Sequence, residues 1–269
     1  RMPDPVLQQV EHFNNPGVTA NDSFKPVTRY FDRITRPEQI IQSFPAAIQT
    51  MLDPADCGPA CISLSQDIQG QTFDYPEEFF KEKIHAIRRP RPDEFQIKEA
   101  AEKIKSSKNP IIISGGGVFY SDAMEDLSNF AIKHNIPVTQ TVMGYSTMKR
   151  DHSHFAGQIG ALGGKNTNSL AKQTDLAIAV GTKLGDFTTG SWANFENENF
   201  KLVSINVSRF DANKHLAQAV IGDAKVSLIE LSKALGDWRI GDDWNEKSQK
   251  ELKIWNEHID KESAPTNQE

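Results

Sequence analysis

The sequence predicts an α/β protein in which a parallel sheet with helices on both faces follows a partial α/β domain. Across residues 96–237, short apolar strands alternate with helix-length segments, a pattern typical of a parallel sheet that is buried on both faces. The composition of the 269 residues, 38% hydrophobic and 25% charged, is close to that of ordinary globular domains and argues against disorder throughout the chain.

The elements of the alternating region follow one another in a regular order, and together they predict a central Rossmann-like (DHS-like) sheet. Residues 175–181 are the strongest strand because they are almost uniformly apolar and end at a glycine. The expected helices are 96–105, 121–134, 166–173 and 224–235, and the expected strands are 111–113, 136–139, 175–181, 201–207 and 219–221.

Residues 1–75 are expected to hold the last helix and strand of a sheet domain whose beginning is absent. Helices are predicted at 5–13 and 37–51, and a strand is predicted at 60–64. Pro37 favours a helix start, because its missing N–H is not needed in the first turn, whereas Pro45 fits inside that helix only with a kink. The first residue is Arg1 rather than Met and the last residues are polar, so a piece of a longer protein is expected.

Residues 76–95 are predicted to be a linker, and residues 238–269 a helical or disordered tail. Prolines interrupt the linker, and five basic residues give it a positive charge: Lys81, Lys83, Arg88, Arg89 and Arg91. The favoured interpretation is a solvated strap between domains, with an anion-binding patch as the alternative. In the tail we expect a short helix that docks through its Trp residues, followed by eight disordered residues.

Charge and hydropathy exclude several classes of partner. The formal net charge is −6 and the isoelectric point is near 5.7, so nucleic acid is not expected as a partner. Mean hydropathy is −0.52, and no apolar run approaches the ~20 residues of a membrane helix. The N-terminus lacks the apolar core of a signal peptide, and two cysteines are too few for a disulfide framework, so a reducing, cytoplasmic location is expected.

Two glycine-containing turns are the candidate binding sites. Gly115, Gly116 and Gly117 follow a strand and precede a helix, where backbone N–H groups could approach a phosphate. Their spacing is not GxGxxG, so a tight turn that binds nothing is an equal alternative. Gly181, Thr182 and Asp186 follow the strongest strand; Asp186 could hold a ligand hydroxyl, although a helix cap is the favoured interpretation.

Other reactive residue types form no complete site. Asp151, His152, Ser153 and His154 resemble a metal cluster, but no further ligand recurs at a suitable spacing, so no metal site is predicted. Cys57 and Cys61 lack the spacing of a redox or zinc motif and are expected to be small buried side chains. Nucleophile elbow, Walker A and HExxH motifs are absent, and the glycines at 157, 160, 163 and 164 are assigned to packing or a flexible loop.

Several segments resemble thiamine-diphosphate-dependent enzymes of the acetolactate synthase type, and the resemblance runs from residue 1 to about residue 237. The most specific segment, residues 21–39, resembles family members that hydrolyse a C–C bond in a cyclic 1,2-dione. Residues 206–209 replace an acid that is common in acetolactate synthases. The segments that carry the resemblance are RMPDPVLQQ (1–9), NDSFKPVTRYFDRITRPEQ (21–39), GPA (58–60) with SQD (65–67), and NVSR (206–209).

The resemblance implies the end of a pyrimidine-binding domain and a whole central domain. The family's cofactor-activating Glu would lie before residue 1, and its Mg²⁺- and diphosphate-binding Gly-Asp-Gly…Asn motif would lie after residue 269. Thiamine diphosphate and Mg²⁺ are therefore implied for the full-length enzyme, with no cofactor certain for this chain, which is expected to be inactive by itself. The other partners implied are the missing N- and C-terminal domains and a homo-dimer or tetramer.

In some members of the family the central domain binds FAD or ADP, and the two glycine turns are the matching places here. The first alternative is accordingly a stand-alone module that binds FAD, ADP or NAD. The second alternative is part of an acetolactate-synthase-like carboligase, against which residues 21–39 argue.

Overall fold

The computed structural model describes residues 14, 15 and 17–265, and it divides the chain into two compact units with the boundary between Arg88 and Arg89. The helix expected at residues 5–13 lies outside the described residues. Each unit is described separately.

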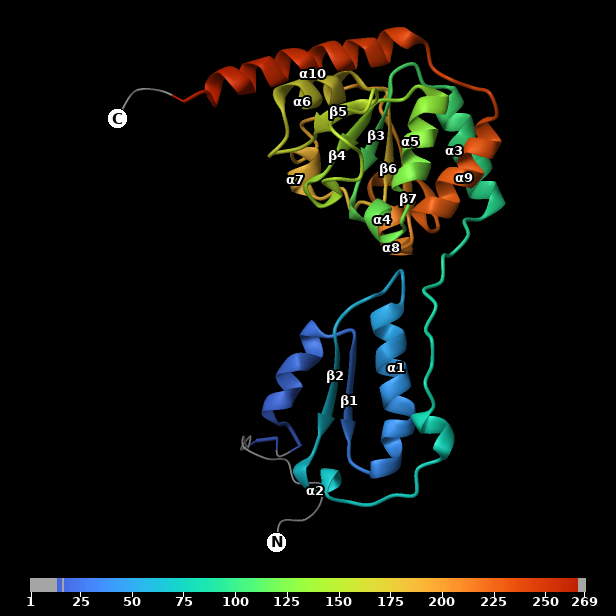
Figure 1. The fold of residues 1–269 in the computed structure, drawn as a ribbon, viewed down its shortest axis with the longest axis vertical. Helices are drawn as coiled ribbons and strands as arrows, with labels where there is room; N and C mark the ends of the chain where they lie inside the picture. The colour runs from blue at the N-terminus through green and yellow to red at the C-terminus, as the bar shows by residue number, and fades with distance from the viewer. Residues whose placement is uncertain (1–13, 16, 266–269) are drawn as a thin grey trace. The chain divides into compact units, whose positions relative to one another are not determined.

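The first unit is built around two parallel strands, β1 and β2, which pair from Tyr30↔Ala60 to Ile34↔Leu64. Helix α1 connects them and packs on both (Figure 1). The predicted strand at 60–64 is confirmed, and the predicted helix is confirmed with a 3₁₀ start. Helix α1 continues through Pro45. The elements are η1 (Ala20–Val27), β1 (Tyr30–Ile34), η2 (Pro37–Gln39), α1 (Ile40–Leu52), β2 (Ala60–Leu64), α2 (Gln66–Gln69) and η3 (Glu77–Phe80).

Strand β1 was not predicted, because two charged residues, Asp32 and Arg33, stand in the middle of its five residues. Both side chains have hydrogen-bond partners within the first unit. Asp32 accepts a hydrogen bond from Ser43 of α1, and Arg33 bonds to Thr19 (2.9 Å) and Asp22. Lys25, the backbone N–H of Thr19 and Arg33 together hold the pKa of Asp22 far below its usual value.

The second unit contains a six-stranded sheet in the order β5-β4-β3-β6-β7-β8, and all of its neighbouring strands are parallel. The predicted fold class is confirmed. The strands are β3 (Pro110–Ser114), β4 (Val138–Gln140), β5 (Phe155–Gln158), β6 (Leu176–Val180), β7 (Lys201–Asn206) and β8 (Gln218–Ile221). The helices are α3 (Glu94–Lys105), α4 (Gly116–Tyr120), α5 (Met124–His134), η4 (Val142–Gly144), α6 (Lys165–Gln173), α7 (Asp186–Thr189), α8 (Arg209–Ala212), η5 (Lys214–Leu216), α9 (Ala224–Leu235) and α10 (Asp242–Glu262).

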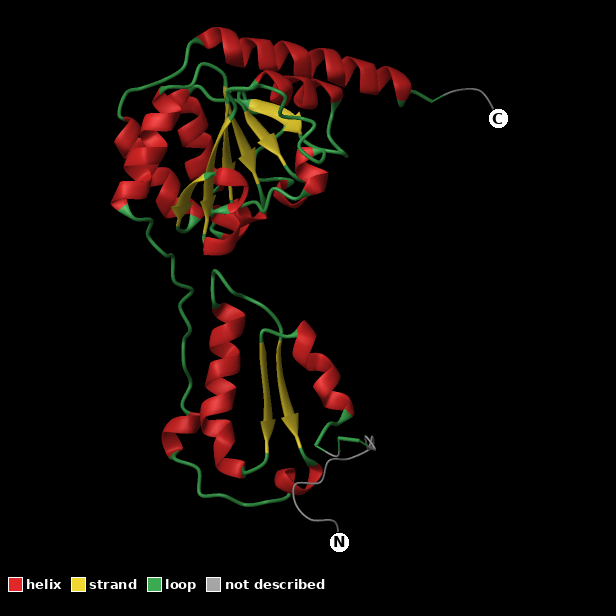
Figure 2. Ribbon diagram, turned by 180° about the vertical axis from the view of Figure 1, so that it is seen from behind, coloured by secondary structure: helices red, strands yellow, loops and turns green. Residues whose placement is uncertain are grey.

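Helices cover the sheet in two groups (Figure 2). Helices α3 and α5 both pack on α9, and α3 and α9 contact β7. Helices α6 and α10 pack on each other and on β5. The two central strands, β3 and β6, are buried along their whole length, as expected for a parallel sheet with both faces covered. The sheet therefore exposes chiefly the ends of its strands.

Three local features of this unit differ from the predictions. Residues 155–158 form the edge strand β5, which was not predicted, rather than a flexible loop; the packing alternative is confirmed for Gly157, which lies at φ +107° and where a Cβ would lie 2.6 Å from Thr167 Oγ1. The helix predicted at 121–134 is α5, which begins three residues later than predicted; the short helix α4 precedes it where only a glycine turn was expected, and Asp122 lies between the two at φ 53°. The short tail helix is the 21-residue α10, anchored by the Trp244 indole N–H, which donates to Pro110 O at 2.8 Å. Within the described part of the chain, no helix combines the length and apolarity needed to cross a bilayer.

Candidate functional site

A pocket of about 370 Å³ lies at the carboxyl end of the sheet, where the segments after β3, β4 and β6 meet. It brings together residues from both predicted glycine turns. The segment after β4, which was not predicted, contributes Thr141, Val142 and Met143. The lining residues are Gly116, Gly117, Tyr120, Thr141, Val142, Met143, Gly181, Thr182, Lys183, Leu184, Gly185, Phe187 and Thr188.

The position of this pocket follows from the strand order. Strand β3 has β4 on one side and β6 on the other, so the connections from β3 and β6 diverge to opposite sides of the sheet. Ligands of open parallel sheets bind at this switch point, outside the carboxyl ends of the strands. The pocket is therefore where the topology alone places a binding site.

The glycines of the two turns serve chiefly to bring the turns together. The N–H of Gly115 donates to Val180 O, and that of Gly117 donates to Gly181 O, both at 2.9 Å. A Cβ on Gly115 would lie 2.4 Å from Gly181 O, and one on Gly181 would lie 2.6 Å from Gly117 Cα. Two of the N–H groups expected to bind phosphate are thus occupied by the protein itself, and Gly115 does not line the pocket.

Asp186 is not the helix cap that its position suggested. Gly185 is the N-cap of α7, and its carbonyl accepts from Thr188 N at 2.9 Å. Asp186 is exposed in the first turn and does not line the pocket. Thr182 does line it, and the Thr182 carbonyl accepts from the Asn206 side chain at 3.2 Å, which ties the turn to the end of β7.

The pocket has an apolar rim and a few polar groups. Tyr120, Met143 and Phe187 are each more than two-thirds exposed around it. Thr141, Thr182, Thr188 and Lys183 supply hydroxyls and one cation. The sequence analysis did not select Tyr120, Met143 or Phe187, although each lies in a segment that follows a strand, which could have been used as a signal.

The histidine pair of the metal-like sequence is bonded to protein groups. His152 Nε2 lies 2.8 Å from Ser128 Oγ, and His154 Nε2 lies 3.1 Å from Asn135 Oδ1. Burial lowers the pKa of His152, and burial together with the neighbouring His152 and Arg239 lowers the pKa of His154 to about 4. Among residues 14, 15 and 17–265 there is no group of three or more His, Cys, Asp or Glu side chains that could hold a metal ion.

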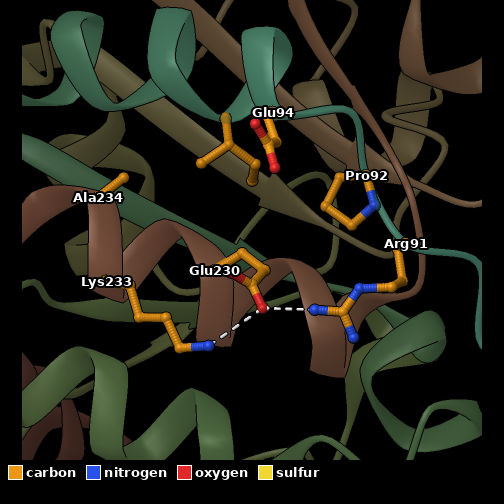
Figure 3. A pocket seen from close by; sticks show the side chains of 7 residues that line it. Arg91, Pro92, Glu94, Glu230, Lys233 and Ala234 are labelled. Atoms are coloured by element: carbon orange, nitrogen blue, oxygen red, sulfur yellow. Dashed lines mark hydrogen bonds and ion pairs between the residues drawn. The ribbon is translucent and has the colours of Figure 1, made fainter.

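Part of the basic linker is anchored by ion pairs although its side chains remain exposed. Arg89 pairs with Asp223 at 3.1 Å, and Arg91 pairs with Glu230 at 2.7 Å. Figure 3 shows Arg91 and Lys233 both directed at Glu230 beside a groove of about 430 Å³. Because Arg89 and Arg91 already face carboxylates, the anion-patch interpretation fails for these two residues.

Comparison with known proteins gives the family. The profile described as "Thiamine pyrophosphate enzyme, central domain" matches residues 97–231, which include every residue that lines the pocket. The chain belongs to the thiamine pyrophosphate enzyme family.

Several curated relatives carry the same name. "3D-(3,5/4)-trihydroxycyclohexane-1,2-dione hydrolase" of Clostridium perfringens strain 13 is 44% identical over 259 residues, which are 96% of this chain and 40% of that protein. The proteins of that name from Clostridium botulinum strain Alaska E43 and Bacillus subtilis strain 168 are 47% and 46% identical, over 87% and 86% of this chain and 36% of each relative. The chain thus spans about 40% of the length of the curated relatives it matches.

The pocket does not fit the cofactor that gives this family its name. None of its described lining residues is a carboxylate, whereas a thiamine diphosphate site needs an acid to activate the aminopyrimidine. Carboxylate oxygens also hold the Mg²⁺ that accompanies a diphosphate. The lining instead combines threonine hydroxyls and Lys183 with an apolar rim.

Proposed function

We propose that this chain is the middle part of a thiamine-diphosphate-dependent hydrolase that opens trihydroxycyclohexane-1,2-dione by C–C cleavage, giving 5-deoxyglucuronate in myo-inositol catabolism in the cytoplasm. The similarity over 96% of the chain, in both units, carries the proposal. Residues 1–75 would be the end of the pyrimidine-binding domain, 76–95 a linker and 96–237 the central domain. Residues 238–269 would lead toward a diphosphate-binding domain.

In this proposal the chain by itself is inactive. Thiamine diphosphate, when bound, would supply the carbanion that adds to a substrate carbonyl, and the groups that activate it and hold its Mg²⁺ would lie outside the chain. The residues of this chain would position the domains that carry those groups. The absence of carboxylates from the described lining of the pocket supports this division of roles.

A chimaera tests the proposal. The segment of the Bacillus subtilis hydrolase that matches residues 97–231 is replaced by the segment from this chain, and ring opening of the dione is measured with thiamine diphosphate and Mg²⁺. We expect the chimaera to open the ring, while the 269-residue chain alone gives no product. A chimaera that folds and binds the cofactor but does not open the ring would contradict the proposal.

We also propose that the intact protein is a homo-dimer or tetramer. Large apolar side chains at the carboxyl end of the sheet support an interface: Phe119, Tyr120, Met143, Phe187 and Phe210 are each at least 58% exposed. Light scattering of the purified intact protein should give twice or four times the mass of one intact chain, and a monomer at micromolar concentration would contradict the proposal.

A second candidate function is nucleotide binding at the pocket, which its position at the switch point favours. We propose that Gly116, Gly117, Gly181 and Thr182 contact FAD, ADP or NAD, with Gly115 and Asp186 at the border of the site. Calorimetric titration of the chain with each nucleotide should give saturable binding. Thr182→Val should weaken it, while Thr72→Val, the same change at an exposed position of the first unit, serves as the matched control. Absence of binding for all three nucleotides would contradict nucleotide binding, and the two glycine turns would then serve only to pack against each other.

A further inference from the structure

The segment between α9 and α10, residues 236–241, is held by three buried side chains from another part of the second unit. His134 is the last residue of α5, Asn135 is its left-handed C-cap, and His154 immediately precedes β5. Their exposed fractions are 0%, 6% and 7%. We call these three side chains the clasp and residues 236–241 the connection, whose course from α9 to α10 is visible in Figure 1.

His134 binds the connection directly. Its Nδ1 lies 2.6 Å from Trp238 O, and its Nε2 lies 3.0 Å from Ser232 Oγ. A carbonyl oxygen only accepts, so Nδ1 carries the hydrogen, and Nε2 of the neutral ring accepts from the Ser232 hydroxyl. The carbonyl of His134 also accepts from Ile240 N at 3.1 Å. One residue thus fixes both ends of the segment from 238 to 240.

Asn135 and His154 fix the end of the connection and the start of α10. The amide nitrogen of Asn135 donates to Ile240 O, Gly241 O and Asp242 Oδ1, at 3.2, 3.3 and 3.0 Å. This orientation leaves Asn135 Oδ1 to accept from His154 Nε2, so the hydrogen of the neutral His154 ring lies on Nε2. His154 Nδ1 then accepts from Ser153 Oγ at 3.0 Å.

The surroundings oppose a positive charge on either histidine. The charged groups that face the clasp are Lys133 from α5, Arg239 and Asp242 from the connection and the start of α10, and Asp151 and His152 from the loop before β5. Asp242 is already paired with Arg239 at 2.7 Å. Burial lowers the pKa of both His134 and His154 below the usual value for histidine.

We infer that the clasp is a proton-dependent latch: neutral histidines fix the connection and the first turns of α10, and protonation of either histidine loosens them. Protonation forces the Ser232 or Ser153 hydroxyl to turn from donor to acceptor, and it places a buried charge beside Lys133 or Arg239. Opening of the connection removes both penalties, because the protonated ring then reaches water. Acidification therefore shifts the equilibrium toward the open connection.

Hydrogen exchange of the whole 269-residue chain tests the latch. Protection factors, corrected for the intrinsic pH dependence of exchange, are measured between pH 7 and pH 4 for the amides of residues 240–250. We expect protection there to fall by up to about tenfold per pH unit for each titrating histidine. The amides of β3 and β6, which lie in the fully buried core and outside the clasp, should stay more protected than residues 240–250 at every pH, which marks the opening as local. An unchanged protection of residues 240–250 would overturn the inference.

Paired variants assign the effect. His134→Asn and His154→Gln each keep an N–H donor at the position of the donating ring nitrogen but do not titrate, so the double variant should lose the pH dependence at residues 240–250. His258→Gln is the matched control, because His258 is a half-exposed histidine on α10 outside the clasp, and it should behave as the wild type. Retention of the full pH dependence in the double variant would contradict the latch.

A measurement on the unmodified chain covers the case in which the double variant does not fold. NMR titration follows the ring protons of His134 and His154 together with the indole N–H signals of Trp238 and Trp244. We expect the indole signals to shift with the same midpoint as at least one of these histidines. Titration of both histidines without any shift of the indoles would exclude the coupling.

Discussion

Gly117 and Gly181 let two turns from neighbouring strands touch through their backbones. Gly181 has φ 60°, a left-handed conformation that costs an L-residue about 1–2 kcal/mol, and its close approach to Gly117 leaves no room for a side chain. The floor of the pocket therefore depends on the absence of two methyl groups rather than on any functional group.

We expect Gly181→Ala to lower the free energy of unfolding by at least about 1–2 kcal/mol, because it combines left-handed strain with a 2.6 Å approach of Cβ to Gly117 Cα. Gly185→Ala is the control, since a Cβ there meets nothing within 4 Å and φ is −70°. Its effect should stay below about 1 kcal/mol, as a weaker cap and a stiffer unfolded chain oppose each other. Urea denaturation of both variants makes the comparison, and equal effects would show that the close contact carries no strain.

For these individual residues, the sequence predicted that the glycines lie in turns, but it did not predict whether their N–H groups bind a ligand or the protein itself. Strand–glycine–helix order located Gly115–Gly117 and Gly181, because a parallel strand must end in a turn. Whether their N–H groups face a ligand or a neighbouring carbonyl depends on the approach of β3 to β6, which is a tertiary contact. Local sequence does not encode this choice, so the two interpretations of the triple glycine were equally supported until the partners Val180 O and Gly181 O were known.

Asp223 joins two elements through one carboxylate. Its Oδ1 caps α9 by accepting from Lys225 N and Val226 N, at 3.0 and 3.3 Å, and its Oδ2 accepts from Arg89 at 3.1 Å. The side chain is 6% exposed, so both functions act away from bulk water. The backbone N–H of Asp223 also donates to Pro90 O at 2.8 Å, which fastens residues 89–90 to the start of the helix.

The two functions of Asp223 can be separated by substitution. Asp223→Asn keeps a good cap and removes the charge, so we expect a loss of about 1 kcal/mol in the free energy of unfolding. Asp223→Ala removes both, and about 2–3 kcal/mol should be lost. Arg89→Ala reports the ion pair alone, and it should resemble the Asn variant. If Asn costs as much as Ala in denaturant unfolding, the ion pair rather than the cap is the dominant interaction.

Helices and strands were predicted correctly where burial produces a simple pattern of apolar residues. Residues 60–64 and 224–235 match β2 and α9 without change, because an apolar run or an apolar stripe is readable locally. Strands β1 and β5 were missed, since Asp32 and Arg33 of β1 find partners in other elements and Gly157 of β5 adopts a positive φ. The length of α10 was missed because its second half buries almost nothing, with Ile254 58% and Ile259 43% exposed.

Protonation affects the stability of the molecule as a whole. Burial lowers the pKa of His134, His152 and His154 in the folded chain, so the unfolded chain binds more protons below about pH 6.5. Stability should therefore fall as the pH decreases below about 6.5, and the contribution of His154, up to about 1.4 kcal/mol per pH unit, extends to about pH 4. Denaturation at pH 7 and pH 5 measures this, and equal stability at both values would contradict burial as the cause.

The two units differ in how much apolar surface they bury. Among the described residues, the buried apolar side chains of the first unit are Ile34, Ala47 and Ile68, whereas a continuous core runs through the second unit from α3 to α10. A sheet of two strands is marginal in water without further packing. Residues 81–88 between the two are exposed and carry no regular structure, so a protease can reach their backbone.

Limited trypsin digestion should therefore cut first at Lys81, Lys83 or Arg88 and then degrade the first unit. We expect a resistant fragment that begins between residues 82 and 89, because trypsin does not cleave before Pro90 or Pro92 and the next site, Lys98, lies within α3. Mass spectrometry of the digest identifies its ends, and the exposed lysines in the second half of α10 should shorten only its other end. A resistant fragment that retains β1 and β2 would mean that the first unit is as stable as the second despite its smaller core.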